Sequence, residues 1–147
     1  MRSVLPLIAV LGFSMPASAA VAWAGANAST AGFGVHAGAA LLPVPFLGTV
    51  GLEGSAERPW RTTESSFNRF AAGVTVRDLN LPLTRVDAFA TVGGQLLVPA
   101  GSGVNRFALY GEGGLRGPVF GPAGWRAFVR ATTAGQVAAG VGLELRF

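Results

Sequence analysis

The segment 136–147 alternates between apolar side chains and side chains that are small, polar or charged, and this alternation strongly constrains the fold. Successive side chains of a β-strand point to opposite faces. One face would carry Val137, Ala139, Val141, Leu143, Leu145 and Phe147, and the other would carry Gln136, Glu144 and Arg146. The pattern therefore predicts a strand that lies between an apolar and a polar environment.

Seven further segments have strand-like character and are separated by stretches rich in Gly, Pro, Asn or Ser. The eight segments span about 20–27, 31–41, 46–55, 67–77, 85–97, 106–116, 125–133 and 136–147. Most of them are close to the length of about 9–11 residues that a tilted strand needs to cross a bilayer.

Charged residues test the alternation. Within every segment that carries more than one charge, all charges have the same parity, whereas Phe89 and Phe128 are apolar exceptions on that parity. An Arg facing the lipid midplane costs about 2–4 kcal/mol, but inside a barrel it can pair with a carboxylate. We therefore predict an interior charge network of Glu53, Arg69, Arg77, Arg85, Asp87, Glu112, Arg116, Arg126, Arg130, Glu144 and Arg146. At eight strands the interior is filled by side chains, which excludes a wide pore.

The first residues have the features of a cleaved secretory signal. Met1 and Arg2 precede an apolar run over 4–13, and Ala17-Ser18-Ala19 supplies the small residues that a signal peptidase needs. We predict a signal peptide over 1–19 and a single domain over 20–147.

Composition favours a membrane-embedded barrel over a water-soluble domain. The chain is 50% hydrophobic and only 12% charged, and its mean hydropathy is +0.48. After the signal, no stretch offers the roughly 18 uninterrupted apolar residues of a membrane helix. The fold class expected is all-β, an eight-stranded antiparallel up-and-down transmembrane β-barrel whose apolar parity faces lipid.

Several chemistries find no support in the sequence. The net charge is +4, but the basic residues are arginines scattered singly, so no track for nucleic-acid phosphates exists. The absence of Cys removes disulfides and thiolate chemistry. His36 is the only His, and we interpret it as an interior polar residue. We expect no enzymatic activity, no catalytic residues, no metal site and no cofactor.

In these features the chain resembles the small eight-stranded outer-membrane barrels, the group of OmpA-, OmpX- and OmpW-like proteins. The segment Val141-Gly142-Leu143-Glu144-Leu145-Arg146-Phe147 looks like the signal that the barrel-assembly machinery reads, with Val141, Leu143, Leu145 and Phe147 as its apolar positions. The resemblance implies a bacterial outer-membrane location and delivery by periplasmic chaperones. The role expected is structural or surface-interactive, with an unknown external ligand.

This topology would place both chain ends and three turns in the periplasm. The longest external link, 56–66, contains Trp60 between Arg58 and Arg61. These three residues are the candidates for contact with an external ligand. Aromatic residues near segment ends would form the interfacial belts, namely Trp23, Phe33, Phe46, Phe107, Trp125 and Phe147.

An alternative fits the same alternation. A soluble secreted or periplasmic barrel resembling lipocalins would point the apolar parity inward, around a small apolar ligand, and the charged parity toward water. A lipid-modifying barrel enzyme is a third possibility, but no nucleophile–base pair is visible to support it.

Overall fold

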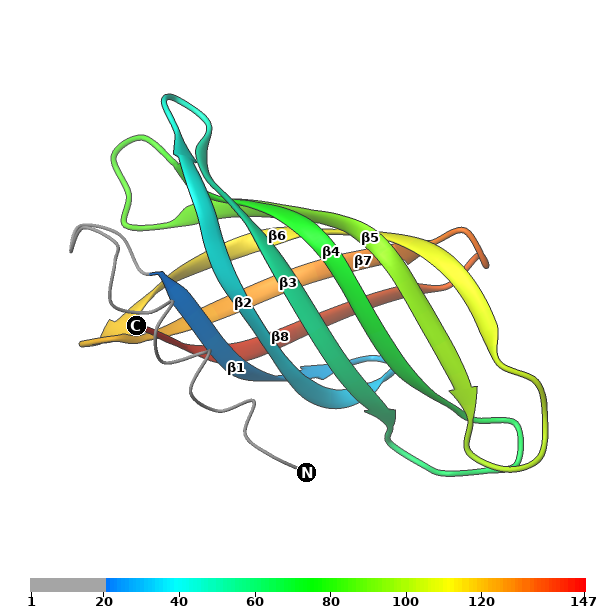
Figure 1. Ribbon diagram of the computed structural model, residues 1–147. Coiled ribbons are helices and arrows are strands. Elements are labelled where there is room, and N and C mark those ends of the chain that lie inside the picture. Colours follow the sequence, from blue (N-terminus) through cyan, green and yellow to red (C-terminus); the bar gives the residue numbers. More distant parts are fainter. Residues whose placement is uncertain (1–20) are drawn as a thin grey trace, which may run out of the picture.

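The computed structural model describes residues 21–147 and consists of eight antiparallel strands that form one closed barrel (Figure 1). The strands are β1 (Ala22–Ser29), β2 (Gly32–Val44), β3 (Gly48–Pro59), β4 (Phe67–Asn80), β5 (Asp87–Pro99), β6 (Arg106–Phe120), β7 (Ala123–Thr132) and β8 (Val137–Arg146). Each strand pairs with the next one in the chain, and β8 pairs with β1. The predicted fold class is confirmed. The proposed signal peptide over 1–19 lies outside the described residues.

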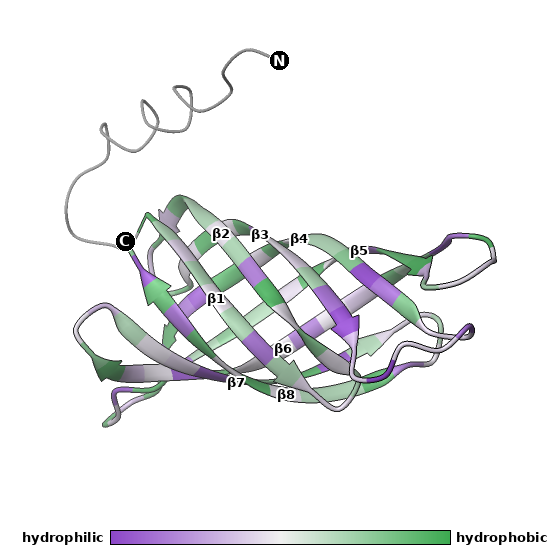
Figure 2. Ribbon diagram, turned by 90° about the horizontal axis from the view of Figure 1, so that it is seen from below, coloured by the Kyte–Doolittle hydropathy of each residue, from purple (hydrophilic) through white to green (hydrophobic). Residues whose placement is uncertain are grey.

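In the central part of each strand, the two parities separate between the inside and the outside of the barrel. Large apolar side chains such as Val74, Val92 and Val141 are exposed, whereas Arg77, Arg126 and Glu144 are buried. Figure 2 shows the resulting alternation of hydrophobic and hydrophilic residues along the strands. This facing is the reverse of the one that the soluble lipocalin-like alternative requires, so that alternative is wrong for this fold.

The aromatic exceptions to the parity follow the same geometry. Phe89 and Phe128 point inward and are buried among the interior arginines.

The prediction that Trp23 belongs to an interfacial belt is wrong, because Trp23 lies inside the barrel with 4% of its surface exposed. Its indole occupies the space beside Gly38 and Gly51, where a Cβ would come within 2.3 Å and 2.9 Å of the ring. The other belt candidates Phe33, Phe46, Phe107, Trp125 and Phe147 have the outward parity or lie in links.

The start of β1 and the end of β8 lie at one end of the barrel, together with the β2–β3, β4–β5 and β6–β7 turns (Figure 1). We call this the terminal end, and we call the opposite end the distal end. At the terminal end β2, β4 and β6 run several residues further than predicted, and the pairing shifts at Ala40/Leu42, at Val76/Leu79 and at Pro118/Phe120. Such bulges let a strand continue where simple alternation fails.

Within residues 21–147, no helix is long and apolar enough to cross a membrane.

Candidate functional site

The barrel interior contains a ladder of buried ion pairs, and its first step near the terminal end is Glu144 on β8. The carboxylate of Glu144 accepts hydrogen bonds from Arg116 Nη1 at 3.2 Å, from Arg146 Nε at 3.3 Å and from Arg77 Nη2. His36 Nε2 lies 3.3 Å from the second oxygen of the same carboxylate. These partners come from β2, β4, β6 and β8, so one carboxylate ties together strands on all sides of the barrel.

The middle step is centred on Glu53 and Arg126, which face each other across the barrel from β3 and β7. Arg126 donates from Nη1 to Glu53 Oε1 at 3.1 Å and from Nη2 to Glu112 Oε1 at 2.6 Å. The indole of Trp23 donates to Glu53 Oε2 at 2.8 Å. The guanidinium of Arg126 also lies 4.4 Å from the centre of the Phe89 ring. A buried cation is favoured over an aromatic face, so the aromatic residues support the ion pairs.

The third step lies toward the distal end and is formed by Arg130. Its Nε donates to Glu112 at 2.9 Å, and its Nη1 donates to Glu57 at 3.0 Å. Ser29 Oγ also donates to Glu57, at 3.2 Å. Because Glu112 receives both Arg126 and Arg130, the middle and third steps form one continuous network.

Interior glycines accommodate the large side chains of this network. A Cβ at Gly73 would come within 2.9 Å of the Tyr110 hydroxyl, and a Cβ at Gly140 would come within 2.5 Å of the Phe128 ring. Side chains of the network therefore occupy the space that the glycines leave.

The structure brings together most residues of the predicted charge network, namely Glu53, Arg77, Glu112, Arg116, Arg126, Arg130, Glu144 and Arg146. Asp87 lies at the edge of the network, with its Oδ2 3.8 Å from Arg116 Nη2. Arg69 is buried in the interior without a carboxylate partner among the residues of the described barrel.

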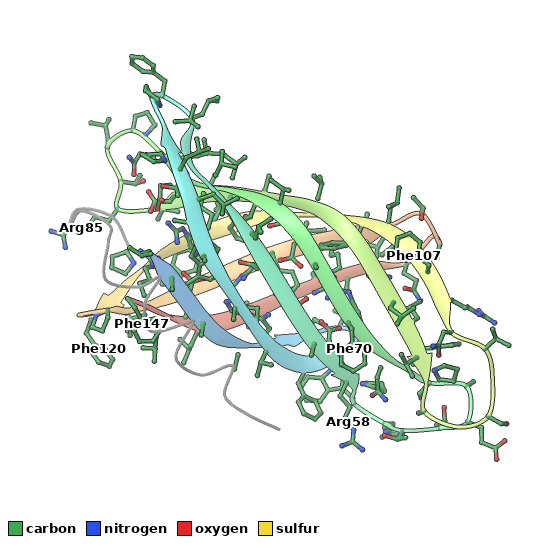
Figure 3. All side chains as sticks on the ribbon, viewed as in Figure 1. Arg58, Phe70, Arg85, Phe107, Phe120 and Phe147 are labelled. Carbon is green, nitrogen blue, oxygen red and sulfur yellow. The ribbon has the colours of Figure 1, made fainter. Side chains whose placement is uncertain are left out.

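The prediction for Arg85 is wrong. Arg85 is exposed in the β4–β5 link, because β5 begins only at Asp87 (Figure 3). Three further residues contact the network and were not predicted as its members: Glu57, His36 and Asp78, the last with 41% of its side chain exposed. Glu57 has the same parity as Glu53 and was assigned to a loop, although β3 continues to Pro59. Asp78 pairs with Arg116 from the bulged end of β4, where parity no longer indicates direction.

The predicted external contact residues lie at the distal end, where β3 leaves the barrel. Trp60 is fixed against the wall: its Nε1 donates to the backbone oxygen of Ser29 at 2.7 Å, and its ring centre lies 5.3 Å from that of Phe33. Arg58 is exposed at the end of β3, and Arg61 is exposed in the link that follows. Trp60 is thus an anchored aromatic residue at the rim and not the free tip of a loop.

The four apolar positions of the predicted assembly signal all lie on the outer surface. Val141, Leu143 and Leu145 are exposed side chains of β8, which pairs with β7 and β1. Phe147 is exposed beyond the end of β8, and its backbone oxygen accepts a hydrogen bond from Val21 N at 2.7 Å. This segment therefore both closes the barrel and presents an apolar row outward.

In the described barrel, no group of three or more His, Cys, Asp and Glu side chains is arranged to hold a metal ion. The single His contacts only one of the acids within salt-bridge distance, and the other carboxylates contact arginines.

A closed eight-stranded up-and-down barrel with a charged interior and an apolar exterior has the architecture of the small outer-membrane β-barrels. Two solved structures share it. The crystal structure of neisserial surface protein A (NspA) matches with a TM-score of 0.58 and 14% identity, over 89% of this chain and 100% of that one. The N-terminal β-barrel domain of Pseudomonas aeruginosa OprF matches with a TM-score of 0.61 and 14% identity, over 88% of this chain and 100% of that domain.

The predicted resemblance to small eight-stranded outer-membrane barrels is thereby confirmed in structure. No family model matches the sequence, and no curated protein is significantly similar to it.

Proposed function

We propose that this chain is an integral protein of the bacterial outer membrane, a closed barrel that does not conduct and that has a structural or surface-interaction role. The observation that carries the proposal is the facing of the strands. Charged side chains are buried inside, and valine, leucine and phenylalanine side chains cover the outside. In water this arrangement would expose a large apolar surface, whereas in a bilayer it gives each face its preferred environment.

The orientation that fits this role places the terminal end in the periplasm and the distal end outside the cell. An even number of strands puts both chain ends on one side, and in bacterial outer-membrane barrels that side is periplasmic. Exposed aromatic residues occur at both ends, with Phe33 and Phe107 near the distal end and Phe46 and Phe147 near the terminal end. Such residues fit the two interfacial regions of a membrane.

The location is tested by membrane fractionation, followed by gel electrophoresis in SDS of unheated and boiled samples. We expect recovery in the outer membrane and a mobility that changes on heating, because a closed barrel stays folded in SDS until it is heated. Recovery of the mature chain in the soluble fraction would contradict the proposal.

The closed interior is tested by conductance across a planar bilayer. The wild-type barrel should give no stable channel steps, because the pairs between Glu53, Arg126 and Glu112 cross its axis. The double variant Glu53→Ala/Arg126→Ala removes both partners of the central pair and should introduce conductance. Channel steps of the same size in both proteins would refute a closed interior.

Within the surface-interaction role, the support for an external contact is the anchoring of Trp60 beside Arg58. The hydrogen bond from Trp60 to Ser29 holds the indole at the rim, with the exposed Arg58 and Arg61 on either side in sequence. Guanidinium groups bind phosphate strongly, so lipopolysaccharide phosphates are suitable ligands.

The double variant Arg58→Gln/Arg61→Gln should be retained severalfold less on immobilised lipopolysaccharide, whereas Arg85→Gln at the other end should be retained normally. Equal retention of all three proteins would exclude this contact.

The proposed partners during biogenesis are periplasmic chaperones and the barrel-assembly machinery. Support comes from the exposed apolar row of β8, which a partner can reach before the barrel closes.

A further inference from the structure

A cavity of about 420 Å³ opens at the distal end of the barrel, above the third step of the ion-pair ladder. Its polar lining includes Glu57, Arg69 and Arg130, and its apolar lining includes Phe67, Leu97 and Ala138. Figure 3 shows this end of the molecule, with Arg58 at its rim. The volume lies within the range of small-molecule sites, about 300–1,000 Å³.

Arg69 differs from the other interior arginines. Arg77, Arg116, Arg126, Arg130 and Arg146 each lie within 4.0 Å of a carboxylate, whereas Arg69 has no such partner in residues 21–147. Arg69 is nevertheless buried, with 6% of its surface exposed. A buried guanidinium without a counter-charge is strongly disfavoured.

The hydrogen bonds of Arg69 hold it in place without neutralising it. Its Nε donates to Gln95 Oε1 at 2.7 Å, and its Nη1 donates to Ser55 Oγ at 2.8 Å. Its Nη2 is buried and has no hydrogen-bond partner within the described part of the chain. The Tyr110 ring, 4.7 Å from the guanidinium carbon, supplies only a weak attraction. The guanidinium group of Arg69 is therefore fixed in position, and its Nη2 can still donate a hydrogen bond to a ligand.

The charges that line the cavity do not compensate Arg69. Three arginines, Arg58, Arg69 and Arg130, line it together with a single glutamate, Glu57. Glu57 already accepts hydrogen bonds from Arg130 and Ser29. The cavity thus combines an excess of positive charge, a fixed guanidinium and an apolar wall.

We propose that this cavity is a binding site for a small anionic molecule, in which a phosphate or carboxylate group pairs with Arg69 and an apolar body packs against Phe67 and Leu97. The guanidinium is suited to this task, because its planar donors match the geometry of both groups. The proposal goes beyond the outer-membrane location and the closed interior and does not rest on them, although Arg58 at the cavity rim is also part of the lipopolysaccharide contact proposed above. The failure of the anion site would leave the location and the closed interior unchanged.

The test is isothermal titration calorimetry of the refolded full barrel in detergent, with phenyl phosphate as the probe and benzyl alcohol as its neutral counterpart. We expect saturable binding of phenyl phosphate at one site, weakened by added salt, and no saturable binding of benzyl alcohol. The same heat from both compounds, or no saturation with phenyl phosphate, would overturn the proposal.

Two variants locate the binding. Arg69→Gln should weaken binding of phenyl phosphate by at least about tenfold, as expected when a charge-assisted hydrogen bond is lost. Ala138→Leu keeps every charge but fills space beside Arg130, and it should weaken binding comparably. Arg85→Gln makes the same charge change at the opposite end and should bind like the wild type.

Undiminished binding by folded Arg69→Gln protein would refute the assignment. The comparison of phenyl phosphate with benzyl alcohol on the wild type decides the proposal even where a variant does not fold.

The anionic group can belong to a free molecule or to a lipid headgroup, and a competition experiment separates the two sources. Barrels in nanodiscs with and without lipid A are titrated with phenyl phosphate. Loss of phenyl phosphate binding in the presence of lipid A identifies the headgroup phosphate as the occupant, and unchanged binding identifies a free anion.

Discussion

Glu144 is the residue on which the interior network depends most directly. Its carboxylate contacts His36, Arg77, Arg116 and Arg146 in a region shielded from water. Glu144→Gln keeps the size of the side chain but leaves these guanidinium groups without their shared counter-charge. Removing one partner from a buried ionic cluster typically costs about 3–5 kcal/mol.

We therefore expect Glu144→Gln to lower the free energy of unfolding by about that amount, measured by urea unfolding of vesicle-inserted barrel and followed by tryptophan fluorescence. Glu64→Gln, in the exposed β3–β4 link, should change it by less than about 0.5 kcal/mol. Equal stability of the two variants would mean that the network adds nothing to the fold.

The space beside Gly38 and Gly51 that holds the Trp23 indole provides a second prediction at this scale. A methyl group at Gly38 would meet the Trp23 ring at 2.3 Å and the backbone oxygen of Leu52 at 2.5 Å. Gly38→Ala should displace the indole, break its hydrogen bond to Glu53 and destabilise the barrel by about 1–3 kcal/mol. The tryptophan emission should shift at the same time. Gly111→Ala is the matched control, since nothing lies within 4 Å of its added Cβ, and it should behave like the wild type.

At the residue scale, the sequence predicted a partner only where parity and strand extent were both right. Glu53 and Arg126 satisfied both conditions. Arg85 failed because β5 begins two residues later than expected, and Glu57 was missed because β3 runs further. Trp23 was misplaced for another reason: the space for its indole is made by glycines of β2 and β3, and an isolated segment gives no sign of that contact.

At the scale of the element, each strand has to keep its apolar side chains on the outer surface. Val92 lies near the middle of β5, pairs with Val74 and Gly111, and is 64% exposed. Val92→Arg would place a charge at the level of the lipid tails, at a cost of about 2–4 kcal/mol.

We expect Val92→Arg to lower the fraction that folds into lipid vesicles, as measured by heat-dependent gel mobility, while Val92→Leu folds like the wild type. Efficient folding of Val92→Arg would contradict the lipid-facing assignment of this parity.

Alternation and turn residues predicted that all eight strands exist, but they did not predict where each strand ends. At the β2–β3 turn, Phe46 and Gly48 both have positive φ, and the pairing of β2 shifts at Ala40/Leu42. A bulge changes the parity of every later residue, so a pattern with period two loses its meaning beyond it. The strand ends beyond the bulges, at the terminal end of the barrel, could therefore not be placed from the sequence.

At the scale of the whole molecule, closure depends on β8 meeting β1, and Phe147 takes part through its backbone. Its N–H donates to Ala22 O at 2.9 Å, and its oxygen accepts from Val21 N at 2.7 Å. The side chain is 69% exposed and lies outside the closed interior. Phe147→Ala should therefore leave closure intact, so that urea-denatured protein refolds into detergent with nearly the yield of the wild type.

In cells the same substitution should lower the amount of heat-modifiable barrel in the outer membrane severalfold, because the assembly machinery would lose an apolar contact. Phe120→Ala is the matched control, since Phe120 is 75% exposed at the same end of the barrel but is the last residue of β6 (Figure 3). It should insert normally. If Phe147→Ala fails to refold in detergent as well, the side chain stabilises the barrel itself. If both variants insert equally well in cells, the aromatic ring of Phe147 is not part of an assembly signal.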